Sequence, residues 1–426
     1  MGSEGWATVP VSNLCHIYLG GTPRRSEPSY WGGSIKWATA ADVANCHTRY
    51  LEKVEQTITE RGVAESAAKV LPKNTIVITA RGTVGSLCML PEPMAFNQTC
   101  YGLVAREGVI HSYLYYALKA AVSQINSLSY GTVFDTITMK SFDSLSVPVL
   151  PIEEQQAIAC ILGALDDKIE LNRRMNQTLE AMARAIFKSW FVDFDPVRAK
   201  AAGRQPPGLV PHISELFPDS FVNSELGEIP RGWKVAKLTD EFNLTMGQSP
   251  PGSTYNESGH GYPFFQGTKD FGHRFPAKRV YCTAPTRFAH AGDTLVSVRA
   301  PVGNLNMASE KCCIGRGLAA LRHRSNSRSY TYYAMHFAKG LFLVFDAEGT
   351  VFGSISKKDL ESISFVAPPT EVVSMFELIV FPIDEQISTN EREIKVLAAL
   401  RDALLPKLIS GELRVPDAER IIGRCV

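Results

Sequence analysis

The sequence predicts an α+β protein in which two mixed α/β domains are joined by two long antiparallel coiled-coil helices, arranged as a pseudo-twofold internal repeat. Three observations support this fold class: a collinear duplication, a heptad pattern that recurs in both copies, and a globular composition. The chain has 426 residues, of which 45% are hydrophobic and 20% are charged. These proportions exclude disordered and collagen-like chains, and the length is typical of two or three domains.

Short motifs recur in the same order in the two halves of the chain. The closest match joins residues 112–117 (Ser-Tyr-Leu-Tyr-Tyr-Ala) to residues 329–334 (Ser-Tyr-Thr-Tyr-Tyr-Ala). Further matching segments are residues 5–6 with 232–233, 20–23 with 247–250, 81–85 with 299–303, and 131–134 with 349–352. Because chance similarity would not stay collinear over so long a stretch, we interpret the halves as two copies of one unit.

The expected order of elements follows from this duplication. Short β-rich runs such as residues 74–79 and 293–298, separated by glycine and proline turns, predict a mixed domain in each half, with one helix after the tyrosines. Residues 193–230, the expected connector between the two copies, are polar and long enough to let the second long helix return antiparallel to the first. The expected domains are 1–150 (first mixed domain), 151–192 (central long helix), 193–230 (connector), 231–368 (second mixed domain), 369–412 (C-terminal long helix) and 413–426 (tail).

A heptad pattern marks both long helices. The predicted seam of the first helix is Ile158, Leu162, Leu165, Ile169, Asn172, Leu179, Ile186 and Trp190. The predicted seam of the second is Phe376, Val380, Ile383, Ile387, Asn390, Leu397, Leu404 and Leu408. Such a stripe is also typical of a helix that packs on its own domain. Two equal stripes, each with an asparagine at the same level, favour pairing of the helices and predict that Asn172 lies opposite Asn390. Pro382 should kink or restart the second helix, because it removes one helical hydrogen bond.

The charges are unevenly distributed along the chain. Lys+Arg total 44 and Asp+Glu total 43, but residues 231–368 hold 17 basic and 10 acidic side chains, a local net charge of 17 − 10 = +7. A local basic surface attracts phosphate even when the whole chain is nearly neutral. A helix of about 38 residues spans roughly 57 Å, enough to hold two domains over separated major-groove segments of a DNA duplex.

Signatures of catalysis and of metal binding are missing from the sequence. It contains no G-x-x-x-x-G-K-[ST], G-x-G-x-x-G, H-E-x-x-H or G-x-S-x-G motif, and its nine cysteines include no C-x-x-C pair. We therefore expect no catalytic residue, no metal site and no cofactor in this chain, and we interpret Asp166 and Asp167 as part of a solvated helix face. The lack of a signal-peptide pattern and of a long apolar run predicts a cytoplasmic protein without membrane contact.

A set of weak motifs becomes specific when its members are taken together. They are the Gly-Trp pair near the start of each half, residues 20–23 and 131–134 with their copies, the run 147–156 that leads into the first long helix, and the runs 187–197 and 404–413. With the heptad helices, this combination resembles the DNA specificity (S) subunit of type I restriction-modification systems over nearly the whole chain. The second copy departs from the pattern at Thr370-Glu371, where the first copy has a Glu-Gln pair.

The resemblance implies a concrete function. Each mixed domain would be a target-recognition domain that reads one half of an asymmetric bipartite site in double-stranded DNA. The helices would set the unread spacer and dock the modification subunits, which are adenine methyltransferases that use S-adenosylmethionine. A restriction subunit, a translocase and nuclease that uses ATP and Mg²⁺, would join the complex, and this chain would be its non-catalytic specificity subunit. The alternatives are a coiled-coil scaffold protein that binds no DNA and an enzyme of unfamiliar type.

The residue types that bind DNA indicate candidate contacts. Arginine and lysine bind phosphates and guanine edges, and glutamine binds adenine. The candidates in the first domain are Arg24, Arg25, Lys36, Arg81, Thr83, Thr132 and Lys140. Those in the second domain are Gln248, Gln266, Lys269, Arg274, Lys278, Arg279, Arg299, Thr350 and Lys358. Each of them can also be interpreted as a surface charge or a loop hydroxyl.

Two further groups have a structural interpretation. Gly20 and Gly247 would provide a positive φ in their turns. The tyrosine pairs 115–116 and 332–333 are expected to pack in the core rather than to stack on bases.

Overall fold

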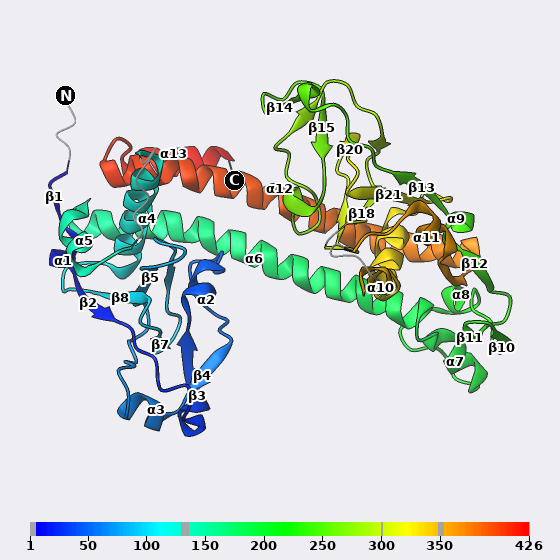
Figure 1. Cartoon of the computed structure of the whole chain (residues 1–426), viewed down its shortest axis with the longest axis horizontal. Helices are drawn as coiled ribbons and strands as arrows, with labels where there is room; N and C mark the ends of the chain where they lie inside the picture. The colour runs from blue at the N-terminus through cyan, green and yellow to red at the C-terminus, as the bar shows by residue number, and fades with distance from the viewer. Residues whose placement is uncertain (1–5, 129–135, 300, 348–352, 426) are drawn as a thin grey trace. The chain divides into compact units, whose positions relative to one another are not determined.

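The computed structural model describes residues 6–128, 136–299, 301–347 and 353–425. The chain divides into two compact units: unit 1 consists of Met1–Asn172 and Glu393–Val426, and unit 2 consists of Arg173–Arg392. The two long helices, α6 (Ile152–Phe191) and α12 (Thr370–Ser410), each belong in part to unit 1 and in part to unit 2 (Figure 1). Of the helices in the described ranges, none is both long and apolar enough to cross a membrane.

Unit 1 contains a four-stranded antiparallel sheet with the order β2-β8-β5-β6, a three-stranded sheet β4-β3-β7, and the pair β1-β9. Its strands are β1 (Thr8–Pro10), β2 (Cys15–Leu19), β3 (Trp31–Ala38), β4 (Gln56–Ile58), β5 (Ile76–Thr79), β6 (Leu87–Met89), β7 (Ala95–Phe96), β8 (Cys100–Ala105) and β9 (Ser146–Pro148). Its shorter helices are α1 (Val11–Leu14), α2 (Ala40–Ala44), α3 (Glu60–Ala64), α4 (His111–Leu128), α5 (Met139–Ser144) and α13 (Val415–Cys425).

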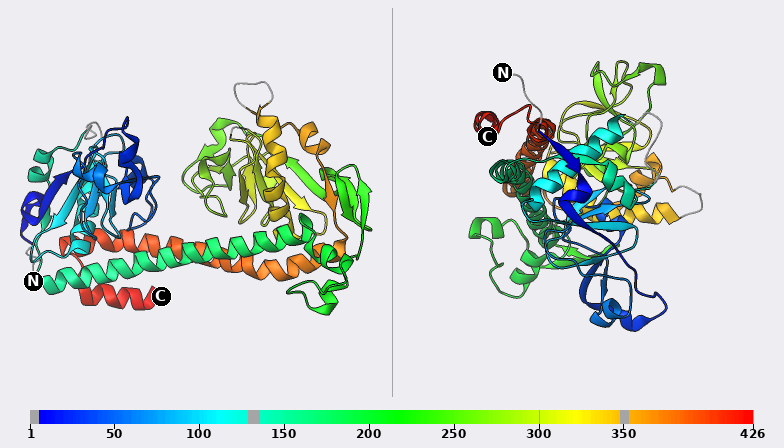
Figure 2. Two further views of the ribbon diagram at one scale, coloured as in Figure 1. Left: turned by 90° about the horizontal axis from the view of Figure 1, so that it is seen from below. Right: turned by 90° about the vertical axis from the view of Figure 1, so that its left-hand side faces the viewer.

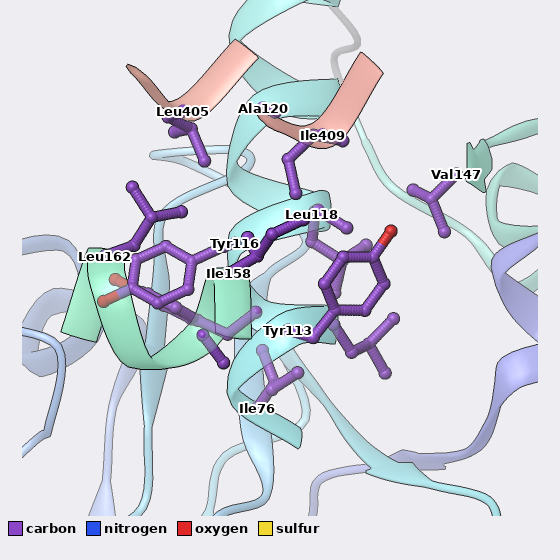
Figure 3. Packing of buried hydrophobic residues seen from close by; sticks show 14 of the residues in the cluster. Ile76, Tyr113, Tyr116, Leu118, Ala120, Val147, Ile158, Leu162, Leu405 and Ile409 are labelled. Carbon is purple, nitrogen blue, oxygen red and sulfur yellow. The ribbon is translucent and has the colours of Figure 1, made fainter. Parts of the chain in front are cut away.

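The core of unit 1 lies between its four-stranded sheet and the long helices. Strand β5 is buried on both faces, and its side chains alternate: Ile76 and Ile78 face the main core, while Val77 faces a second cluster. Helix α4 packs Tyr113 and Tyr116 into the main core (Figure 3). The other core residues drawn there are Leu118, Ala120, Val147, Ile158 and Leu162, with Leu405 and Ile409 of α12. The sheet is thereby held on both long helices by apolar contacts.

Unit 2 repeats this arrangement with additional strands. Its sheets have the orders β13-β21-β18-β19 and β14-β16-β15-β20-β17, and two further pairs are β12-β22 and β10-β11. The strands are β10 (Phe221–Ser224), β11 (Gly227–Pro230), β12 (Lys234–Lys237), β13 (Phe242–Met246), β14 (Tyr255–Asn256), β15 (Tyr262–Phe265), β16 (Tyr281–Cys282), β17 (Phe288–Ala289), β18 (Thr294–Ser297), β19 (Leu305–Met307), β20 (Cys312–Ile314), β21 (Leu318–His323) and β22 (Ser364–Ala367). The shorter helices are α7 (Asp195–Ala201), α8 (Pro211–Ser214), α9 (Leu238–Glu241), α10 (Arg328–Ala347) and α11 (Lys357–Ser362).

The duplication inferred from the sequence is confirmed by the strand order. The sheet β2-β8-β5-β6 of unit 1 corresponds to β13-β21-β18-β19 of unit 2, and in both the strands pair antiparallel. In both units one parallel pair occurs in the other sheet, β3 with β7 and β15 with β20. Helix α10 packs on β19 and β21 as α4 packs on the corresponding strands β6 and β8. Unit 2 differs by the edge strands β14 and β17 and by the pair β10-β11.

The parts of α6 and α12 that belong to one unit lie side by side and run antiparallel (Figure 2). In unit 1, Asp166 of α6 contacts Arg401 of α12, and Asn172 contacts Glu393. In unit 2, Asn176 contacts Asn390, and Trp190 contacts Phe376. As the residue number rises along α6 it falls along α12, which defines the antiparallel direction. The predicted seam residues that are buried are Ile158, Leu162, Leu165, Ile169, Asn172, Trp190, Phe376, Val380, Ile387, Asn390, Leu397, Leu404 and Leu408.

Beyond Asn172 the predicted seam is correct only in part. Trp190 is buried, whereas Leu179, Ile186 and Ile383 are half-buried. The buried positions on α6 continue instead at Asn176, Glu180, Ala183, Phe187 and Trp190. After Asn172 the buried stripe advances by two consecutive steps of four residues, which an α-helix of 3.6 residues per turn favours over a strict heptad.

Two other details of the helix pair differ from expectation. The amide of Asn390 donates to Asn176 Oδ1 at 2.8 Å, whereas Asn172 donates to Glu393 Oε2 at 2.9 Å, so Asn390 is not paired with Asn172. Helix α12 does not restart at Pro382. Because Pro382 is exposed, water can bond the carbonyl that the missing N–H leaves unpaired, while buried residues on either side keep the helix packed.

Candidate nucleic-acid interface

In unit 2, three loops meet at one end of the four-stranded sheet. Met246, the last residue of β13, pairs with Ala319 near the start of β21, and Ser297, the last residue of β18, pairs with Leu318. The loops that follow β13 and β18 and the loop that precedes β21 therefore leave the sheet together. They bring Gln248, Arg299 and Arg316 to the same end of the sheet.

Backbone hydrogen bonds tie these loops together in both units. In unit 2, Gly247 N donates to Leu318 O at 2.9 Å, Val298 N to Gly317 O at 2.9 Å, and Ile355 N to Val298 O at 2.9 Å. The corresponding bonds of unit 1 run from Gly20 N to Cys100 O at 3.1 Å, from Ala80 N to Thr99 O at 2.8 Å, and from Ile137 N to Ala80 O at 2.9 Å. The same backbone framework therefore occurs at the sheet end of both units. We call this region the sheet-end site of each unit.

The first glycine of each repeated turn is required by close packing, which corrects the expectation of a positive φ. Neither Gly20 nor Gly247 is among the glycines with positive φ. A Cβ on Gly20 would lie 2.1 Å from Asn97 O, and one on Gly247 would lie 2.1 Å from Gly315 O. Both contacts are with backbone, which has little room to move, so no larger residue fits without displacing a loop.

The sheet-end site of unit 2 encloses a pocket of about 500 Å³, which we call the sheet-end pocket. Its lining residues are Met246, Gly247, Val298, Arg299, Arg316, Gly353, Ser354, Ile355 and Ser356. Among these described residues none is acidic. Arg316, which is not among the predicted contacts, lies between Gly315 and Gly317 and occupies the place of Gln98 in the first copy. The duplication itself was the signal that could have identified it.

The remaining candidates of unit 2 are placed as follows. Gln248 is exposed at the sheet end. The side chain of Gln266 is hydrogen-bonded to that of Ser249, which follows Gln248 in the turn. Lys269 and Lys358 are exposed. Lys278 and Arg279 are already paired, with Glu310 and with Asp270. Thr350 lies outside the described residues.

Arg274 is not a surface residue, which corrects its assignment as a DNA contact. Its side chain is 1% exposed, and its guanidinium donates to Asp384 Oδ1 at 2.9 Å and to Tyr333 Oη at 3.0 Å. It also lies over the Tyr332 ring at 3.9 Å from the centroid. Burial disfavours its charge, but Tyr332, Asp384, Tyr333 and Glu180 together outweigh that effect and raise the pKa of Arg274. A cation enclosed in this way has no path to a phosphate, and it holds its loop to α12 instead.

In unit 1 the candidate cations fall into two groups. Arg81 and Thr83 are exposed at the sheet-end site, and Arg24 and Lys140 are exposed elsewhere. Arg25, in contrast, donates to Gln56 at 2.7 Å and stacks 4.3 Å from the centroid of Trp31. Lys36 forms an ion pair with Glu92 at 2.6 Å. Thr132 lies outside the described residues.

Both units share an anchor between a buried tyrosine and an aspartate of a long helix. Tyr116 Oη donates to Asp166 Oδ2 at 2.7 Å, and Tyr333 Oη donates to Asp384 Oδ1 at 3.0 Å. The expectation that Asp166 lies on a solvated face is therefore wrong: its side chain is 9% exposed and also accepts from Arg401 at 2.6 Å. Asp167 is 66% exposed and pairs with Arg49. The four adjacent tyrosines are buried, as expected.

Within the described part of the chain, no group of histidine, cysteine, aspartate and glutamate side chains could hold a metal ion. The arginines at the two sheet ends are hydrogen-bond donors, a chemistry that suits anions and base edges.

The chain is similar to known proteins over most of its length. The family described as "Type I restriction modification DNA specificity domain" matches residues 3–181 and 230–397, one stretch in each copy. The MjaIX specificity subunit of Methanocaldococcus jannaschii is 29% identical over 97% of this chain and 95% of its own length. The HindI specificity subunit of Haemophilus influenzae is 29% identical over 66% of this chain and 72% of its own length.

A crystal structure of the type I restriction-modification system S subunit from M. genitalium matches 96% of this chain and 97% of its own chain with a TM-score of 0.60. At 17% identity, this likeness concerns the fold. Because the family match spans both copies of the repeat, the chain belongs to the type I restriction-modification DNA specificity family.

Proposed function

We propose that the chain is the DNA sequence-recognition subunit of a type I restriction-modification complex. Each sheet-end site would read one half of an asymmetric bipartite site, and the paired helices would set the spacer between the halves. The observation that supports this most strongly is the repeated sheet end, where Arg81 and Arg299 occupy equivalent places and both are exposed. Two copies of one reading surface with different side chains match a site made of two different halves.

The proposal includes partners. The curated relatives are specificity subunits of type I restriction enzymes, and by analogy the long helices would dock modification subunits, which a restriction subunit would join. S-adenosylmethionine, ATP and Mg²⁺ would be bound by those partners, and this chain would be non-catalytic. A subunit that works on cellular DNA is expected in the cytoplasm.

The test is methylation mapping of DNA in cells that express this chain with its genomic neighbours. We expect an interrupted two-part adenine motif, and we expect only one half of it to change when residues 231–368 are exchanged for the corresponding domain of another subunit. If the motif changes in both halves, the division of labour between the domains is wrong. If no motif depends on the chain, a coiled-coil scaffold without DNA binding becomes the better interpretation.

A further inference from the structure

The sheet-end pocket of unit 2 contains two arginines where unit 1 has one. Arg299 corresponds to Arg81, but Arg316 corresponds to Gln98, whose Oε1 accepts a hydrogen bond from the Thr22 hydroxyl. Both Arg299 and Arg316 are exposed. In the described part of the chain, no carboxylate forms an ion pair with either guanidinium. Two like charges gathered without a counter-charge favour an anion between them.

The backbone of the pocket holds these arginines in place. Arg299 forms a backbone bridge with Ser354, and the N–H of Arg316 donates to Ser249 Oγ at 3.2 Å. Ser249 is in turn fixed by Gln266, whose amide donates to the same Oγ at 2.9 Å. The guanidiniums thus extend from loops that are bonded to the sheet and to one another, which lowers the entropy lost on binding a ligand.

A hydroxyl group adds a donor beside the arginines. Ser354 lines the same pocket and is exposed on its wall. The Ser356 hydroxyl, in contrast, is bonded to Asp359, with which it forms a capping box at the start of the next helix. Guanidinium and hydroxyl donors around a small hollow form a typical environment for a phosphate group.

The hollow shape distinguishes between two ligands on DNA. Base edges lie inside the grooves of a stacked duplex and are reached by side chains or elements that protrude from a protein. Phosphates project outward from the duplex and can enter a recess. A concave site of about 500 Å³ with arginines on its wall therefore suits a phosphate better than a base edge.

We propose that the sheet-end pocket of unit 2 binds a backbone phosphate of the DNA duplex, with Arg316 and Arg299 as its charged ligands and Ser354 as a hydroxyl donor. This inference rests on the proposed function, because it assumes that DNA is the partner. It assigns Arg316 a role that Gln98 does not have in unit 1. Unit 2 thereby contacts the DNA backbone through one more positive charge than unit 1.

The cations of unit 2 that the sequence indicated as phosphate contacts are less suitable. Lys278 forms an ion pair with Glu310, and Arg279 bonds Asp270 at 2.9 Å. A phosphate would have to compete with these carboxylates. Arg316 has no such competitor in the described ranges, so we assign it the larger share of the salt-dependent affinity.

The experiment measures DNA binding by the assembled complex with its modification subunits, over a series of salt concentrations, on cognate and unrelated duplexes. We expect Arg316→Gln, which installs the residue type of unit 1, to weaken binding to both duplexes about tenfold, the size of one lost charged hydrogen bond. We expect it to reduce the slope of log K against log salt by about 0.9, the value for one phosphate contact. Arg316→Lys should keep most of the slope because it keeps the charge.

Arg324→Gln is the matched control. Arg324 is an exposed arginine that follows β21, at the opposite end of the strand that Arg316 precedes, and its guanidinium donates to Thr239 O at 2.9 Å. It should leave the salt slope unchanged.

The outcomes separate the two proposals. An unchanged slope for Arg316→Gln overturns the phosphate site, and so does an unchanged slope accompanied by lost discrimination at one base pair, which would assign Arg316 to a base. A wild-type complex that binds no DNA overturns the proposed function itself. Because Arg316 is exposed, its variants should unfold at the wild-type midpoint, and that measurement accompanies the binding series.

Discussion

The two units use the same backbone framework but differ in how charges are placed on it. At the anchor to the long helices, unit 1 has Asp166 shared by Tyr116 and Arg401, with Arg49 on the neighbouring Asp167. Unit 2 replaces this with one fully buried cation, Arg274, between α12 and α10. The tyrosine–aspartate hydrogen bond is common to both units. The cation beside the aspartate differs: it is Arg401 for Asp166 in unit 1 and Arg274 for Asp384 in unit 2.

The difference has an energetic consequence. In unit 2, Arg274 Nε and Asp384 Oδ2 are buried without a hydrogen-bond partner, and Glu180 Oε2 lies 3.8 Å from the guanidinium. The exposed carboxylate of Asp167 in unit 1 keeps contact with water. A buried charge depends on its partner much more than an exposed one, so the two anchors should respond differently to the same change.

The largest expected effect is at this anchor. Arg274→Ala should lower the free energy of unfolding of unit 2 by about 3–5 kcal/mol, because it leaves Asp384 buried without its cation. Arg49→Ala should cost about 1 kcal/mol or less, because its partner is exposed. Urea unfolding followed by tryptophan fluorescence measures both, since Trp190 and Trp233 report on unit 2 and Trp31 and Trp37 on unit 1. Equal losses from the two variants would show that the anchors are energetically alike.

The next effect tests what the two units have in common. Gly20→Ala and Gly247→Ala should each cost about 1–3 kcal/mol, because the new methyl group meets a backbone carbonyl at 2.1 Å in either unit. Gly252→Ala is the control, since nothing lies within 4 Å of its added Cβ. Thermal unfolding of the three variants measures the losses. If Gly247→Ala melts like the wild type, the sheet-end framework of unit 2 is looser than that of unit 1.

A smaller effect concerns the asparagines that pair α6 with α12. A double-mutant cycle of Asn176→Ala and Asn390→Ala should give a coupling free energy of about 0.5–1.5 kcal/mol, because their side chains share a hydrogen bond of 2.8 Å in unit 2. The cycle of Asn172→Ala and Asn390→Ala should be additive within about 0.5 kcal/mol. Urea unfolding provides the four free energies of each cycle. Coupling of Asn172 rather than Asn176 to Asn390 would favour the register predicted from the heptads.

The smallest effect concerns thiol reactivity. A hydrogen bond from Cys88 lowers the pKa of Cys46 to about 6, against the effect of burial. The reactive thiolate therefore forms as pH rises through about 6, whereas burial raises the pKa of Cys312 in unit 2 to about 12. Iodoacetamide labelling followed by peptide mass spectrometry should show Cys46 modified at neutral pH and Cys312 unmodified. A labelling rate of Cys46 that rises only above pH 8 would contradict the hydrogen bond.

Much of the architecture was predictable because it depends on patterns within one stretch of chain. The paired tyrosines, the two long helices and the order of motifs in each copy all follow from local spacing, and the corresponding sheets have the same strand order. The heptad pattern misplaced part of the seam beyond Asn172, where Leu179 and Ile186 are half-buried and the buried stripe changes its step. There Asn176 and Glu180 are polar, and polar residues at buried positions leave no apolar signal in the sequence.

The duplication, the α+β class, the long helices and the basic character of residues 231–368 can be read from the amino-acid sequence, because repetition, periodicity and charge count are properties of the chain as written. Which charged side chains are available to a ligand depends on the folded structure. Arg274 is enclosed by Asp384, which is 110 residues away in sequence. Lys278 is neutralised by Glu310, whereas Arg316 has no carboxylate partner in the described ranges. The availability of a charge depends on partners that folding brings from distant parts of the chain, and residue type alone does not contain that information.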